Sequence, residues 1–160
     1  MSIAALPGLK IHHVSISVPD MEVALAWYAD ILGFQEEFRF SIGALSAQGA
    51  FMVRDGLRIE LWAIKDAGRV PEVRREPNTD LHAGGTKHAA FLVTDLQGSL
   101  VELVRRGVDI AAVQRNSTEP MDKDADPLAP GKPPAFAAFI RDPGGTLIEL
   151  LDAERVAKHG

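Results

Sequence analysis

The sequence predicts an α+β fold made of two tandem copies of one strand–helix–strand–strand–strand unit. Each half of the chain opens with a histidine before an alternating strand, His13 or His88, and closes with an Ile-Glu-Leu tripeptide centred on Glu60 or Glu149. In both halves an aspartate follows the histidine by seven residues and a leucine follows it by twelve. Matches that share one register indicate a duplicated unit.

The first copy spans residues 10–65. Apolar residues at 14, 16 and 18 alternate with serines, which is typical of a half-buried strand. This apolar set should pack on the following helix and leave His13 on the other face, with His12 turned away from it. Asp20 is placed to cap a helix that ends at Gly33, and further strands are expected at about 37–42, 49–54 and 57–64. The predicted buried stripe of the helix is Met21, Ala24, Leu25, Tyr28 and Leu32.

The second copy spans residues 87–152. Asp95 should cap its helix and Gly107 should end it, followed by strands at about 109–114, 135–141 and 146–151. Its predicted buried stripe is Leu96, Leu100, Leu103 and Val104. Residues 66–86 form the predicted linker between the two copies. Residues 115–134, rich in proline and aspartate, form an insertion that is either a flap over the site or mobile surface.

Composition restricts the function. The chain has 160 residues, enough for one domain, and a net charge of −5, which argues against nucleic acid binding. The absence of cysteine excludes thiolate metal sites and cysteine nucleophiles. No apolar run is long enough for a membrane span, and the first ten residues do not resemble a signal peptide, so we expect a cytoplasmic protein.

Strand parity places four ionisable groups on the faces that point away from the helices: His13, Glu60, His88 and Glu149. A lone histidine near a strand start is most often structural, and a single glutamate in a strand can simply be exposed. A carboxylate between two aliphatic residues is expected to be partly buried, however, and an unpaired buried charge is costly. Two such carboxylates repel each other unless a cation lies between them. The matching positions in the two copies therefore predict one metal site made by all four residues.

Three segments carry a family resemblance: residues 26–34 (AWYADILGF), 87–91 (KHAAF) and 142–150 (DPGGTLIEL). Together with His13 they resemble the vicinal oxygen chelate superfamily, over residues from about 10 to 152. This superfamily includes glyoxalase I, methylmalonyl-CoA epimerase, fosfomycin- and bleomycin-resistance proteins and extradiol dioxygenases. The resemblance implies two βαβββ modules that curl into an open mixed β-barrel around one divalent ion, Zn²⁺, Ni²⁺, Co²⁺ or Mn²⁺. The four metal positions of glyoxalase I fall on His13, Glu60, His88 and Glu149.

The resemblance also implies chemistry. Glyoxalase- and epimerase-type members transfer a proton next to a metal-chelated carbonyl of a small substrate, with carboxylates such as Glu149 and Glu60 as the catalytic groups. We expect Glu149 to be the base. An extradiol dioxygenase would instead hold Fe²⁺ with His13, His88 and Glu149 and leave Glu60 superfluous. A drug-binding protein of the same fold generally lacks the metal. A homodimer is expected, and the sequence leaves open whether each site lies within one chain or is shared by two.

The substrate is less well defined by the sequence. Arg39, Arg54 and Arg58 are candidates to bind an anionic group, with solvated surface as the alternative. Trp62 shares strand parity with Glu60 and is a candidate pocket residue, with core packing as the alternative. The predicted linker and tail contain His82 and His159, which are not favoured as ligands.

Overall fold

In the computed structural model, which describes residues 9–158, the chain forms two tandem modules of the predicted kind. His159 and the first eight residues, most of the segment tested above for a signal peptide, lie outside the described residues. The first module consists of β1 (Val14–Ser17), α1 (Met21–Leu32), β2 (Gln35–Ile42), β3 (Ala47–Arg54) and β4 (Leu57–Ile64). The second consists of β5 (Ala89–Val93), α3 (Leu96–Arg105), β6 (Ile110–Gln114), β7 (Ala137–Arg141) and β8 (Leu147–Asp152). The predicted α+β fold is confirmed.

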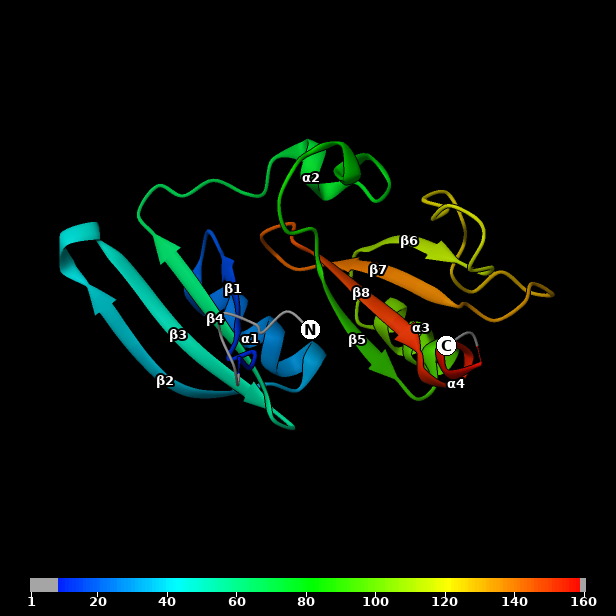
Figure 1. Cartoon of the computed structure of the whole chain (residues 1–160), viewed down its shortest axis with the longest axis horizontal. Helices are drawn as coiled ribbons and strands as arrows, with labels where there is room; N and C mark the ends of the chain where they lie inside the picture. Colours follow the sequence, from blue (N-terminus) through cyan, green and yellow to red (C-terminus); the bar gives the residue numbers. More distant parts are fainter. Residues whose placement is uncertain (1–8, 159–160) are drawn as a thin grey trace, which may run out of the picture.

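Each module forms its own four-stranded mixed sheet (Figure 1). The strand orders are β1-β4-β3-β2 and β5-β8-β7-β6, so the two sheets have the same topology. In each, the histidine strand pairs in parallel with the glutamate strand. The sheets lie side by side and neither closes on itself, in agreement with the open arrangement that was expected.

The predicted helix signals are confirmed in both modules. The Asp20 carboxylate accepts a hydrogen bond from the Val23 amide at the start of α1, and the Asp95 carboxylate accepts one from the Gly98 amide at the start of α3. Gly33 ends α1 in the left-handed conformation, with a φ of 68° that glycine adopts without strain.

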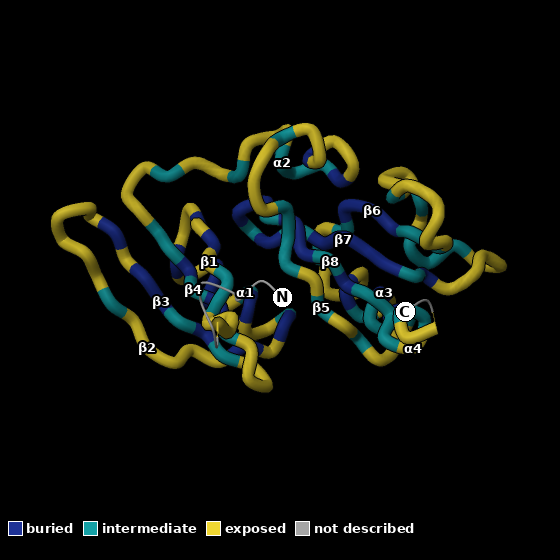
Figure 2. The backbone as a smooth tube through the Cα atoms, viewed as in Figure 1, coloured by how far each residue is buried: buried dark blue, intermediate teal, exposed yellow. Residues whose placement is uncertain are grey.

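One continuous hydrophobic core joins the modules. Every predicted residue of the α1 stripe is buried in it, as are Leu96, Leu100 and Leu103 of α3. Val104 is 42% exposed, so its predicted burial is wrong. Leu103 takes the buried place in the last turn of α3, and Val104 lies about 100° further round the helix. Figure 2 shows that buried positions run along the inner strands of each sheet, whereas β2 at the edge is mostly exposed.

The linker contains structure that the sequence did not predict. It forms a one-turn helix α2 (Glu72–Arg75) and a 3₁₀ turn η2 (Thr79–His82), and a further short helix α4 (Ala153–Ala157) follows β8. Helices of one turn are too short to give a periodic pattern. Arg141 of β7 holds the linker through an ion pair with Glu76 at 2.9 Å, and it forms a second ion pair at 3.0 Å with Asp109, which precedes β6. Among residues 9–158, no helix has the length and apolarity that crossing a membrane requires.

A buried hydrogen bond connects the modules at the turn between β7 and β8. The Tyr28 hydroxyl of α1 donates to the Asp142 carboxylate at 3.1 Å, and the Thr146 amide donates to the same carboxylate at 2.8 Å. Burial raises the pKa of the Asp142 carboxyl above its usual value, while the hydrogen bonds from Thr146 and Tyr28 oppose that rise. Burial, followed by the nearby Asp142 carboxylate, raises the pKa of Tyr28 well above its usual value.

Replacing Tyr28 by phenylalanine is expected to lower the free energy of unfolding by about 1–3 kcal/mol, because a buried carboxylate oxygen loses its donor. Urea denaturation measures this loss, and an unchanged midpoint would show that the hydrogen bond contributes no stability. The pKa of Asp142 should also rise further in this variant.

The same carboxyl makes stability depend on pH. Because its folded-state pKa lies above the ordinary value of 3.8, Asp142 stabilises the fold below that pH, and the contribution is lost as pH rises through the folded-state pKa. Asp142→Asn should flatten this part of the pH dependence, and Tyr28→Phe should steepen it. A series of urea unfolding curves between about pH 3.5 and 7 compares the three proteins.

Candidate metal centre

The first module brings His13 and Glu60 together. His13 directly precedes β1, and Glu60 lies in the middle of the parallel neighbour β4. His13 Nε2 lies 3.3 Å from Glu60 Oε2, and the Glu60 side chain is only 13% exposed. Ser15, which faces Glu60 across the two strands, donates a hydrogen bond from Oγ to the same carboxylate oxygen at 2.9 Å. The first predicted pair of ligands is therefore assembled and supported.

A chain of polar contacts continues behind His13. His13 Nδ1 lies 2.7 Å from His12 Nδ1, and His12 Nε2 lies 2.8 Å from Arg58 Nη1. The guanidinium can only donate, so His12 Nε2 accepts a hydrogen bond from Arg58. Arg58 is itself held by an ion pair with Glu37 at 2.6 Å. The Arg58 guanidinium is thus already bound to His12 and Glu37, which does not favour the predicted role of binding an anionic substrate group.

The prediction that His12 turns away from His13 is wrong. Alternation of side chains applies within a strand, and β1 begins only at Val14, after both histidines. The sequence signal for this contact was that His12 and His13 are consecutive residues.

The second module repeats the pair but not its support. His88 Nε2 lies 3.1 Å from Glu149 Oε2, with the Glu149 side chain 18% exposed. The residue that faces Glu149 across the parallel strands is Ala90, which has no hydroxyl. His88 Nδ1 is buried and has no hydrogen-bond partner among the described residues. The Phe139 ring packs edge-on against His88, with 4.8 Å between ring centroids.

The two pairs do not meet within one chain. Among residues 9–158, no group of three or more histidine and acidic side chains is close enough to hold a metal ion. A cavity of about 330 Å³ lies between the β1 and β5 segments and is bordered by Ser15 and His88. A larger cavity of about 710 Å³ lies between the C-terminal end of α1 and α3 and includes none of the four predicted ligands.

Each pair fits half of a divalent metal site by its chemistry and spacing. Ligand atoms about 2.0–2.2 Å from one ion lie about 2.8–3.6 Å from each other, for octahedral to tetrahedral angles. The observed separations of 3.3 and 3.1 Å agree with this spacing. Two imidazoles and two carboxylates are also donors that Zn²⁺, Ni²⁺, Co²⁺ and Mn²⁺ accept.

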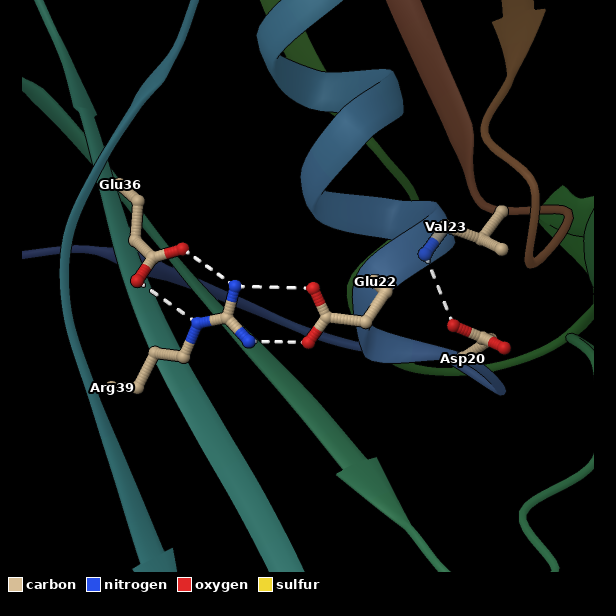
Figure 3. Close-up of polar contacts among 5 residues, drawn as sticks. All are labelled: Asp20, Glu22, Val23, Glu36 and Arg39. Carbon is tan, nitrogen blue, oxygen red and sulfur yellow. Dashed lines mark hydrogen bonds and ion pairs between the residues drawn. The ribbon is translucent and has the colours of Figure 1, made fainter.

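The other candidate residues lie in different surroundings. Arg39 forms one ion pair with Glu36 in the same strand and another with Glu22, which ties β2 to the start of α1 near the Asp20 cap (Figure 3). The hydrogen bonds that Arg39 donates to the Glu36 and Glu22 carboxylates raise its pKa. Arg54 donates to the Leu32 carbonyl at the end of α1. Neither arginine borders a histidine–glutamate pair, so the structure supports their alternative role as surface residues.

Trp62 belongs to a group of aromatic rings on the same face as Glu60. Its ring meets Phe40 edge-on at 5.0 Å, and Phe51 packs against His13 at 5.2 Å. Phe40 can lie over β3 because Gly49 has no side chain, and a Cβ there would come within 2.3 Å of the ring. Trp62 therefore lies on the same face as the first pair, connected to His13 through Phe40 and Phe51, and is not part of the core.

The insertion at 115–134 reaches the neighbourhood of the second pair. Met121 packs on a small cluster that includes Phe139, the residue that contacts His88. Asn78 of the linker holds Met121 by two hydrogen bonds, one to its carbonyl at 2.9 Å and one from its amide at 3.3 Å. The loop thus lies next to the candidate site, and its role as a flap stays a prediction.

Comparison with known proteins agrees with this architecture. Residues 12–124 match the model of the glyoxalase/bleomycin resistance protein/dioxygenase superfamily. The chain belongs to this superfamily. Within it, the YwkD protein of Bacillus subtilis is 33% identical over 150 residues, which cover 89% of this chain and 96% of YwkD. Human mitochondrial methylmalonyl-CoA epimerase is 27% identical over 90% of this chain and 74% of the epimerase.

A solved structure with the same fold is the trypanothione-dependent glyoxalase I of Leishmania major. It superposes with a TM-score of 0.66 at 19% identity and covers 95% of this chain and 92% of that protein. At this identity the likeness establishes the fold alone.

Proposed function

We propose that this superfamily member is a metal-dependent enzyme that transfers a proton at the carbon next to a carbonyl, as glyoxalases and epimerases do. His13, Glu60, His88 and Glu149 would hold one divalent ion. The observation that carries the proposal is that both histidine–glutamate pairs recur at matching positions of two sheets, with N–O separations of 3.3 and 3.1 Å. The match to an epimerase along 90% of the chain favours proton transfer as the reaction.

A bound ion would act as a Lewis acid toward two adjacent substrate oxygens. In the proposed mechanism the imidazoles of His13 and His88 act as neutral ligands, and Glu60 contributes a fixed negative charge. Glu149 removes the proton from carbon and returns it at the same or the neighbouring atom. The Glu149 side chain is 18% exposed, which leaves it accessible to a small substrate.

We further propose a homodimer in which the first pair of one chain meets the second pair of the other. The pairs lie on two separate sheets, and within the described part of one chain they do not come together. Apolar side chains on the same faces as the pairs are open to solvent, with Phe38 49% and Leu92 64% exposed. A second copy that covers these faces would bury them and complete each site.

Metal analysis of protein purified without chelators tests the proposal. We expect about one divalent ion per chain. His88→Ala should lose the ion, whereas His82→Ala, which removes an exposed histidine of the linker, should retain it.

Activity can be followed without knowledge of the natural substrate. Hydroxyacetone has adjacent oxygens and a C–H next to its carbonyl, and its exchange of that hydrogen in D₂O is visible by proton NMR. Redox-inert metal with accelerated exchange supports the proposal. Oxygen-sensitive iron without exchange would indicate a dioxygenase, and protein that binds no metal would indicate a binding protein of the same fold.

A further inference from the structure

We infer that Ser15 is a positioning residue that fixes Glu60 as a permanent ligand, while Ala90 at the matching place leaves Glu149 free to move. This inference rests on the proposed function and divides the work between two otherwise equivalent glutamates. The cause of the different roles is the side chain beside each glutamate, a serine at position 15 and an alanine at position 90.

The backbone register makes the comparison direct. Ser15 is the strand partner of Glu60 in the parallel pair β1–β4, and Ala90 is the strand partner of Glu149 in the parallel pair β5–β8. Residue 15 follows His13 by two positions and residue 90 follows His88 by two. The two modules therefore place a hydroxyl and a methyl group at equivalent points beside the two carboxylates.

The Ser15 hydroxyl forms a hydrogen bond with the Glu60 carboxylate. Ser15 Oγ donates to Glu60 Oε2 at 2.9 Å, and that same oxygen lies 3.3 Å from His13 Nε2. Glu60 is thus held from two sides. The hydroxyl of Ser15 itself is on an exposed residue of an edge strand, so the core does not require it.

The histidines show the same difference independently. His13 Nδ1 contacts His12, which is connected through Arg58 to Glu37. His88 Nδ1 is buried without a hydrogen-bond partner in the described chain. A contact on Nδ1 restricts the orientation of an imidazole ring, as contacts behind metal-ligating histidines do. Within the described chain, the histidine of the first pair therefore has a polar contact on Nδ1, whereas the histidine of the second pair has none.

A glutamate that takes up and returns a proton must reach the substrate carbon, whereas a glutamate that only holds a cation is most effective when it stays in place. Glu149 meets the first requirement because its strand partner Ala90 has no hydroxyl to hold it, and the contact that its carboxylate makes within residues 9–158 is with His88. Glu60 meets the second because Ser15 and His13 both contact it.

Exchanging the two residues tests the inference. Ser15→Ala should weaken Co²⁺ binding by about tenfold, measured by competition with a chromophoric chelator, because partners of metal ligands commonly contribute 10- to 100-fold. Ala90→Ser should bind Co²⁺ more tightly and lower the kcat of hydroxyacetone exchange by about tenfold with little change in KM. Ala90 is exposed, so the added hydroxyl has room.

Two variants serve as controls. Ser17→Ala removes the next hydroxyl on the same face of β1 and should leave Co²⁺ affinity unchanged. Ser15→Thr keeps a donor and should restore the affinity that Ser15→Ala loses. If Ser15→Ala binds Co²⁺ as the unmodified protein does, or if Ser15→Thr is as weak as Ser15→Ala, the inference is wrong and the proposed function stands. Failure of the unmodified protein to bind Co²⁺ would overturn both.

Discussion

Glu149→Gln is expected to lower the rate of hydroxyacetone exchange by about two to four orders of magnitude, the range that general-base catalysis contributes. Glutamine keeps the shape of the side chain and an oxygen that can ligate a metal, but it cannot accept the proton. Metal content should therefore fall much less than turnover. Metal analysis and NMR exchange rates on the same preparation measure the two effects.

Glu60→Gln provides the informative comparison. Under the proposed roles it should reduce turnover by less than about tenfold, because its carboxylate serves as a ligand and accepts the Ser15 hydroxyl through an oxygen that glutamine retains. Glu154→Gln, at an exposed position in α4, is a control for the chemical change itself. A larger loss for Glu60→Gln than for Glu149→Gln would reverse the assignment of base and ligand, and full turnover in Glu149→Gln would remove the base from the proposal.

The second large effect is complementation between two inactive proteins. One carries His13→Ala with Glu60→Ala, and the other carries His88→Ala with Glu149→Ala. Each alone should lose metal and activity. If the pairs meet across a dimer, a mixed dimer has one site with all four replacements and one intact site. Random reassortment makes half the dimers mixed, so about a quarter of the activity should return.

This experiment discriminates between the two possible arrangements of the site. Co-refolding of the two variants followed by metal analysis gives a readout that does not depend on the substrate. If each chain holds its own complete site, mixing restores neither metal nor activity. A protein that remains monomeric by size-exclusion chromatography with light scattering would also contradict the shared site.

The sequence predicted the fold well because each strand and helix of the unit occurs twice, so that the pattern in one half supports the assignment in the other. The paired histidines, capping aspartates and Ile-Glu-Leu strands fixed the register of both modules, and the structure places Ser15 opposite Glu60 and Ala90 opposite Glu149 as strand pairing requires. The parallel pairing of β1 with β4 and of β5 with β8 brings each histidine beside a glutamate, although both histidines lie one residue before their strands.

Two kinds of feature could not be predicted. The contact of His12 with His13 arises outside the strand, where alternation does not hold, and depends on Arg58 and Glu37 from other strands. The separation of the two pairs depends on how the sheets sit relative to each other, which periodicity within one element does not specify. Arg39 likewise forms an ion pair with Glu22 because β2 lies beside the start of α1, which the sequence pattern does not specify (Figure 3).

The attachment of Met121 to Asn78 has a mechanical consequence. Asn78 uses both its amide nitrogen and its oxygen on the backbone of Met121, so the loop at 115–134 is fastened to the segment that connects the two modules. A substrate bulky enough to displace the loop must break both bonds or pull the connecting segment with it. Any movement of this loop is therefore coupled to the segment that connects the two modules.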